Sequence, residues 1–128
     1  ASAGVMKYLE EKDIGIKFGG NTIPLVPSAV IFDLNVGNSK IRPGLDEGYL
    51  AAKNASTNFE LGNVGVGTGC SVGKLLGSKY SMNGGIGFSS HVFGDGTVVE
   101  CLVAVNALGS IVNPENGEFI AGCVTIYG

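Results

Sequence analysis

The sequence has few charged residues: Asp, Glu, Lys and Arg make up 15% of it, against about 25% in ordinary soluble domains. A free-standing domain of 128 residues has a large surface, and eight Lys and Arg with eleven Asp and Glu cover little of it. We therefore expect other polypeptide to cover much of the surface of this chain.

The sequence also lacks a cluster of positive charge and a long apolar run. Its net charge is −3, which argues against binding to nucleic acid or to an anionic membrane, because both need a positive surface. No apolar run reaches the roughly 18 residues that span a bilayer, and residues 1–9 lack the apolar core of a signal peptide. These absences predict no nucleic-acid and no membrane partner.

Cysteine is scarce, and its spacing indicates neither a metal site nor a disulfide framework. Cys70, Cys101 and Cys123 are odd in number, show no C-x-x-C spacing and have no histidine companions in a metal-ligand arrangement. The sequence predicts buried, reduced thiols in a cytoplasmic protein, no metal and no cofactor.

What the sequence has in excess is glycine, at 22 of 128 residues. Five of these glycines fall in residues 62–73, and a backbone so dense in glycine is approached closely by other groups. The segment is not a phosphate loop, because Thr68 and Leu75 occupy positions that need glycine and Ser or Thr. It also lacks the third glycine of a dinucleotide-binding turn, which is replaced by Cys70. A tight turn against another backbone is the better interpretation.

The first half of the chain predicts two helices and one strand. Ser2 is expected to cap a helix that ends before Gly15, and a second helix is expected from Pro43 to about Ala55. Between them, residues 19–27 suggest an irregular extended link, and residues 29–32 form an apolar run typical of a strand buried on both faces.

The second half predicts antiparallel strands. Residues 84–93 and 97–105 are joined by Gly-Asp-Gly, which favours a hairpin. The turn residues 113–117 separate two further apolar stretches, 108–112 and 118–124. The chain is therefore expected to belong to the α/β class.

Lys74 is a candidate catalytic residue because it stands between Gly73 and two leucines. A partly buried lysine can serve as a proton carrier or as a local positive charge. The alternative is an ordinary solvated lysine at the start of a helix.

Asn106 is the second candidate, because the apolar stretch 101–105 ends abruptly in its carboxamide. A buried amide without hydrogen-bond partners costs about 1–3 kcal/mol, and a strand-end amide facing a cleft is a good donor to a developing oxyanion. The alternative is a side chain that bonds the turn formed by residues 107–109. A Ser–His–Asp triad around His91 is conceivable, although a lone strand histidine is more often structural.

Three stretches taken together carry a resemblance to a known family. They are residues 26–34 (VPSAVIFDL), residues 62–77 (GNVGVGTGCSVGKLLG), and residues 84–87 (GGIG) followed by 103–109 (VAVNALG). In this order they resemble the self-processing L-aminopeptidase/D-esterase family of the DmpA type. That family includes β-aminopeptidases and nylon-oligomer hydrolases and is related in fold to ornithine acetyltransferase.

The resemblance implies part of an α/β/β/α sandwich and an N-terminal-nucleophile hydrolase. The precursor of such an enzyme cuts itself before a Ser or Thr, which then attacks amide or ester carbonyls with its own α-amine as base. Asn106 falls on the oxyanion-hole asparagine of the family, and Lys74 on the lysine beside the nucleophile. Phe32 falls where some relatives have a tyrosine whose hydroxyl supports the oxyanion, and a phenylalanine cannot donate.

The resemblance further implies that residues 1–128 are an incomplete middle portion of one catalytic domain. The nucleophile would lie beyond Gly128, on a complementary chain, and whether Gly128 is the self-cleavage point stays open. The expected partners are that chain, further copies in a homo-oligomer of processed heterodimers, and a small peptide or amide substrate. Two alternatives remain: an acyltransferase on the related fold, and a non-catalytic assembly or binding module.

Overall fold

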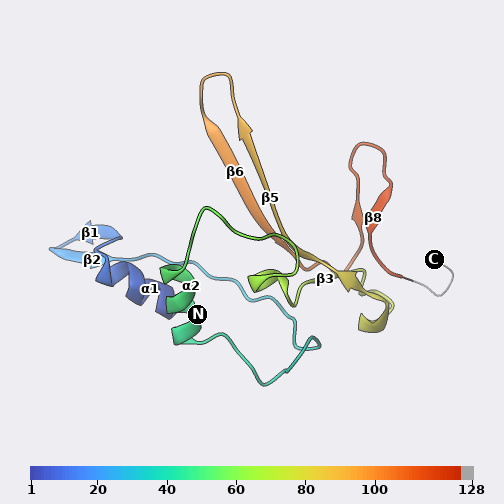
Figure 1. Cartoon of the computed structure of the whole chain (residues 1–128), viewed down its shortest axis with the longest axis horizontal. Coiled ribbons are helices and arrows are strands. Elements are labelled where there is room, and N and C mark those ends of the chain that lie inside the picture. The colour runs from blue at the N-terminus through green and yellow to red at the C-terminus, as the bar shows by residue number, and fades with distance from the viewer. Residues whose placement is uncertain (125–128) are drawn as a thin grey trace. The chain divides into compact units, whose positions relative to one another are not determined.

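The computed structural model describes residues 1–124, and Gly128, the possible self-cleavage point, lies outside them. The chain divides into two compact units (Figure 1). Residues 1–30 with 40–59 form the first unit, and residues 31–39 with those from 60 onward form the second. Helices and strands both occur, so the α/β class is confirmed.

The first unit contains two helices, α1 over Ser2–Glu11 and α2 over Leu45–Lys53, and a hairpin described below. The prediction that Ser2 caps α1 is wrong: Ala1 is the N-cap, and its carbonyl already accepts the N–H groups of Gly4 and Val5. The predicted second helix is confirmed with slightly shorter bounds. At its start, the Glu47 carboxylate accepts the Gly44 N–H at 2.7 Å.

Glycine allows the two helices to pack closely. A Cβ atom at Gly4 would overlap the Leu45 carbonyl, and one at Gly48 would overlap the Ala1 carbonyl. Beside this contact, the rings of Tyr8 and Tyr49 meet edge to face with centroids 5.6 Å apart, and the Tyr49 hydroxyl donates to Glu11 at 2.6 Å. The helix pair is therefore held by backbone contact and by one aromatic cluster.

Residues 16–23 form a hairpin, so the prediction of an irregular link is wrong there. Strand β1 (Ile16–Phe18) pairs antiparallel with β2 (Asn21–Ile23). The two-residue turn between them has positive φ at both Gly19 (57°) and Gly20 (80°), the conformation that a tight hairpin turn requires and glycine permits.

The strand predicted over residues 29–32 is also not formed. Val30 is 96% exposed and Phe32 67% exposed. An apolar strand buried on both faces needs neighbouring strands and two covering layers. Among residues 1–124, none pairs with this stretch.

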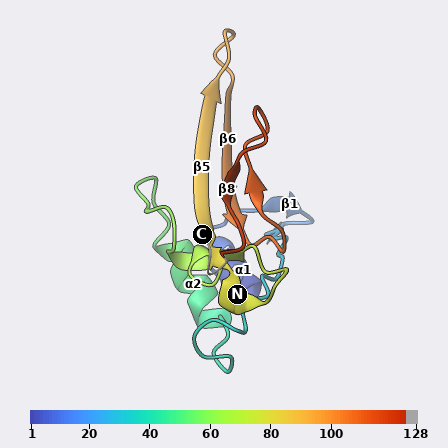
Figure 2. The same cartoon turned by 90° about the vertical axis from the view of Figure 1, so that its right-hand side faces the viewer.

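The second unit is built around the hairpin of β5 (Gly85–Val92) and β6 (Val98–Val105), which confirms the prediction (Figures 1 and 2). Pairing runs from Gly85 opposite Val105 to Val92 opposite Val98. The loop is closed by a bond of 2.8 Å from the Phe93 N–H to the Thr97 carbonyl.

Shorter elements complete the second unit. Strand β3 (Ser71–Val72) pairs with β4 (Met82–Asn83), and β7 (Ile111–Val112) pairs with β8 (Phe119–Ala121) across the predicted turn. Two 3-10 turns, η1 (Gly65–Gly67) and η2 (Ser78–Tyr80), stand on either side of β3 in the sequence.

Few apolar side chains are buried. Of the hydrophobic residues in the described part of the chain, only Cys70 and Val72 are fully enclosed. The prediction of buried thiols holds for Cys70 and is wrong for Cys101, which lies on the exposed stretch of β6 from Val98 to Val103. Cys123 is half-buried.

Within residues 1–124, no helix has both the length and the apolar character needed to cross a membrane.

Candidate active site

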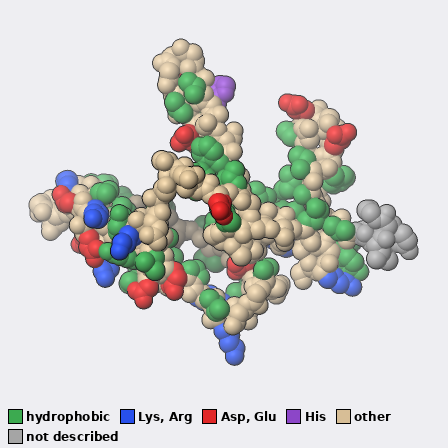
Figure 3. All heavy atoms as spheres, viewed as in Figure 1, with side chains coloured by type: hydrophobic (Ala, Val, Ile, Leu, Met, Phe, Trp, Pro, Cys, Tyr) green, Lys and Arg blue, Asp and Glu red, His purple; other side chains and the backbone are tan. Residues whose placement is uncertain are grey.

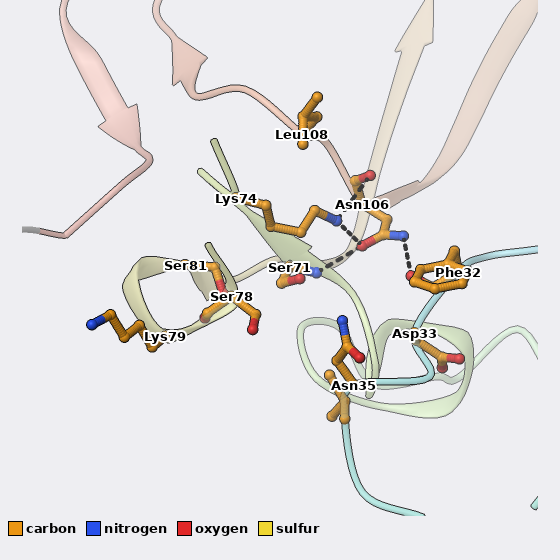
Figure 4. A pocket seen from close by; sticks show the side chains of 11 residues that line it. Phe32, Asp33, Asn35, Ser71, Lys74, Ser78, Lys79, Ser81, Asn106 and Leu108 are labelled. Atoms are coloured by element: carbon orange, nitrogen blue, oxygen red, sulfur yellow. Dashed lines mark hydrogen bonds between the residues drawn. The ribbon is translucent and has the colours of Figure 1, made fainter. Parts of the chain in front are cut away.

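Both candidate residues, Lys74 and Asn106, line one pocket of the second unit (Figure 4). The pocket has a volume of about 600 Å³. Its other lining residues come from the segment before α2, from β3, from η2 and its vicinity, and from the chain just after β6: Phe32, Asp33, Asn35, Val36, Ser71, Ser78, Lys79, Ser81 and Leu108.

The backbone of the glycine-rich segment brings these two residues together. The Gly73 N–H donates to the Gly109 carbonyl and the Lys74 N–H to the Leu108 carbonyl, both at 2.8 Å. Gly73 has φ +72°, and a Cβ there would collide with the backbone at Gly122. Glycine at this position therefore permits the close approach of the Gly122 backbone. The two main-chain bonds set Lys74 beside Asn106, just beyond the end of β6.

The Asn106 amide bonds three groups from two distant parts of the chain. Its Oδ1 accepts the Ser71 N–H at 3.0 Å and the Lys74 ammonium at 2.6 Å. Its Nδ2 donates to the Phe32 carbonyl at 3.2 Å. None of these partners belongs to residues 107–109, so the alternative of a local turn bond is wrong.

Phe32 contributes to the site through its main-chain carbonyl, not through its ring. Its carbonyl holds Asn106 Nδ2, while its ring is mostly exposed. Beside it, Asp33 packs on Gly69: a Cβ atom at Gly69 would lie 2.6 Å from Asp33 Cβ and 2.7 Å from its Cγ. The absence of a side chain at Gly69 thus lets the Phe32–Asp33 segment approach the site.

Lys74 is half-buried and no helix begins there, so it is not the solvated helix-start lysine of the alternative interpretation. Its ammonium also lies 3.5 Å from the Asn106 main-chain carbonyl. The other charged side chains that line the pocket, Asp33 and Lys79, point away from Lys74 and Asn106 (Figure 4). Lys79 instead lies 4.6 Å from the centroid of the Tyr80 ring.

His91 is distant from this pocket. It pairs with Val99 and stacks edge to face on Phe93, with centroids 4.7 Å apart. Val99 is seven residues before Asn106 along an extended strand, which is about 23 Å at a rise of roughly 3.3 Å per residue. A triad that joins His91 to this pocket is therefore excluded by geometry.

Sequence reasoning missed the two main-chain groups of the site, the Ser71 N–H and the Phe32 carbonyl. Every residue type carries such groups, so no side-chain pattern marks them. The glycines at positions 69 and 73 were the available signal, because they indicate close backbone approach. Among residues 1–124, no group of three His, Cys, Asp or Glu side chains could hold a metal ion.

Comparison with known families shows that Peptidase family S58 matches residues 1–122. The chain belongs to this family. Since the match covers nearly the whole chain, the DmpA-type resemblance is confirmed.

Similar proteins occur in mycobacteria. An uncharacterized aminopeptidase of Mycobacterium bovis is 41% identical over 117 residues, which are 91% of this chain and 32% of that protein. An uncharacterized aminopeptidase of Mycobacterium tuberculosis gives the same values. One of Mycobacterium leprae is 37% identical over 125 residues, or 91% of this chain and 33% of that protein. The chain thus spans about a third of the length of these relatives.

Proposed function

We propose that this chain is the middle portion of a self-cleaving N-terminal-nucleophile hydrolase that releases N-terminal residues from peptides, amides or esters. Membership of peptidase family S58 and the aminopeptidase names of the relatives support a peptidase role. The observation that carries the proposal is the oriented Asn106 amide, whose Nδ2 group lies in a pocket beside a lysine.

In this mechanism, Asn106 is the oxyanion donor. A Ser or Thr at the start of a complementary chain attacks the substrate carbonyl, and negative charge develops on the carbonyl oxygen. Asn106 Nδ2 carries two hydrogens, one of which bonds the Phe32 carbonyl, and none of the other described residues takes the second. That second N–H stabilises the oxyanion without losing a proton.

The fold proposed for the whole domain is an α/β/β/α sandwich. The β5–β6 hairpin supports it, because apolar side chains occupy both of its faces: Phe88 and Leu102 on one, Val99 and Val103 on the other. A strand pair that is apolar on both faces suits the interior of a layered structure. The complementary chain and further copies of the processed enzyme are the proposed partners, and three unpaired cysteines favour a cytoplasmic location.

Intact-mass measurement and N-terminal sequencing of every chain in the purified full-length protein test the processing step. Two chains are expected, the second beginning with Ser or Thr. A single uncut polypeptide with full hydrolytic activity would overturn the self-cleaving mechanism. Transfer of an acetyl group from an N-acetyl donor to glutamate would support the acyltransferase alternative instead.

Substitution of Asn106 in the full-length protein tests the oxyanion donor. Asn106→Ala should lower kcat by the roughly 10²–10³ typical of one lost donor. Asn106→Asp is the matched variant, since it keeps the size and the acceptor oxygen but removes the N–H donor. Both variants should show the lower kcat while still folding, which their melting temperatures check. Wild-type turnover in either variant would refute the assignment.

A further inference from the structure

The orientation of the Asn106 amide is set by which groups donate and which accept. Two donors, the Ser71 N–H and the Lys74 ammonium, converge on one end of the amide at 3.0 and 2.6 Å. An acceptor, the Phe32 carbonyl, lies 3.2 Å from the other end. Only the oxygen can face two donors, so a flip of the amide would break all three bonds.

Lys74 contributes the charged member of this set. Among residues 1–124, the Lys74 ammonium donates to two oxygens, both of Asn106: the side-chain Oδ1 at 2.6 Å and the main-chain carbonyl at 3.5 Å (Figure 4). It therefore acts here as a donor to one residue. A cation on the oxygen of an amide draws electrons from its nitrogen, which strengthens each N–H as a donor. Half-burial of both residues strengthens the effect, because water screens it less.

We propose that Lys74 is a positioning residue that acts on the reaction through the Asn106 amide, which it orients and polarises, and not as a proton carrier. The inference rests on the proposed function, since it presumes that Asn106 Nδ2 meets the oxyanion. In this arrangement the amide is fixed before substrate arrives, so no reorganisation is needed when charge develops.

A double-mutant cycle in the full-length protein tests the inference. The variants are Lys74→Met, Asn106→Ala and the two combined, with kcat measured on amino-acid p-nitroanilides. Lys74→Met alone should lower kcat, by less than the roughly 10²–10³ expected of Asn106→Ala, and leave KM nearly unchanged. In the Asn106→Ala background, Lys74→Met should cause no further loss, because the amide through which it acts is gone.

Lys74→Arg separates donation from proton transfer. Arginine keeps the charge and the N–H donors but does not release its proton, so this variant should regain much of the activity lost in Lys74→Met and keep the wild-type pH profile of kcat. An equal loss in Lys74→Arg and Lys74→Met, with a changed pH profile, would identify a proton carrier and overturn the inference.

The outcomes separate this inference from the proposed function. Wild-type kcat in Asn106→Ala would remove the proposed function itself. A second outcome is that Asn106→Ala has a lower kcat, but Lys74→Met lowers kcat equally in the wild-type and the Asn106→Ala backgrounds. This outcome would refute only the inference. It is the result expected if the lysine charge acts directly on the oxyanion. Some variants can slow self-cleavage so far that kcat cannot be measured. The double-mutant cycle is then built from self-cleavage rates, because self-cleavage is also an acyl transfer. The melting temperature of each precursor checks that it is folded.

Discussion

The polar side chains of the pocket were the part of the site that the sequence predicted best. Lys74 and Asn106 stand out because a charged and a polar side chain interrupt apolar stretches, and the structure brings the two into contact. Their main-chain partners could not be predicted. Ser71 lies 35 positions from Asn106 and Phe32 lies 74 positions from it, and main-chain groups leave no trace in residue type.

Glu47 offers a prediction at the same scale. Bonds from its own backbone N–H and from that of Gly44 lower the pKa of the Glu47 carboxyl. A lowered folded-state pKa means that its stabilising effect is present above the unfolded value and is lost as the pH falls through the folded value. Glu47→Ala should therefore weaken the start of α2 at neutral pH and have little effect in acid.

Amide hydrogen exchange over residues 44–53 of the full-length protein measures this effect. Protection in Glu47→Ala should fall below wild type at pH 7, and the difference should vanish on acidification. Asp46→Ala is the matched control, because it also removes a carboxylate from the first turn of α2. It leaves intact the bond in which Glu47 accepts the Gly44 N–H. An equal effect of both variants, or one independent of pH, would contradict the role of this bond.

At the scale of elements, local sequence predicts strands that pair with a neighbour in the chain, but not strands whose partners are distant. The β5–β6 hairpin was predictable, because its strands are adjacent in the chain and Gly96 (φ +84°) supplies the turn. A strand over residues 29–32 would need partners distant in sequence, and none of residues 1–124 pairs with this stretch. Its apolar residues alone therefore do not decide its conformation.

Gly69 is predicted to position the Phe32 carbonyl. In Gly69→Ala, the added Cβ would overlap the Asp33 side chain, so Asp33 must move and carry the adjoining Phe32 carbonyl away from Asn106. We expect a loss of kcat of up to about 10²-fold, the scale of a displacement of about 1 Å in a catalytic site.

Gly94→Ala is the control for this prediction, because nothing lies within 4 Å of a Cβ at Gly94. It should keep wild-type kcat. Unaltered kcat in Gly69→Ala as well would show that the Phe32 carbonyl does not need this close contact.

At the scale of the whole molecule, the low charge content agrees with the exposed apolar surface of the second unit. Hydrophobic side chains follow the β5–β6 hairpin in Figure 3, and Val92, Val98 and Leu102 are each more than half exposed. A two-stranded hairpin is at best marginally stable alone in water. These residues are therefore suited to contact with other polypeptide, as the shortage of charge predicted.

Substitution of Leu102 tests whether other polypeptide covers this hairpin in the full-length protein. If Leu102, 60% exposed in this chain, is buried in the full-length protein, Leu102→Lys should destabilise it by at least the roughly 2–5 kcal/mol of a core leucine truncation. A surface position would change by no more than about 0.5 kcal/mol. Thermal unfolding of the full-length variant measures the difference, and Gly94→Lys, at the tip of the same hairpin, should melt like wild type. Wild-type melting of Leu102→Lys would show that this face stays in water.

The sequence by itself determined the α/β class, the α2 helix, the two C-terminal hairpins, and Lys74 and Asn106 as unusual residues, because each depends on local pattern and turn chemistry. Tertiary structure alone decided that the Asn106 amide is held by Ser71, Lys74 and Phe32. It also decided that the missing side chain at Gly69 leaves room for Asp33, and that the one at Gly73 leaves room for the backbone at Gly122. The physical reason is that hydrogen bonds between distant main-chain groups, and the space that a missing side chain leaves, depend on how the chain folds back on itself.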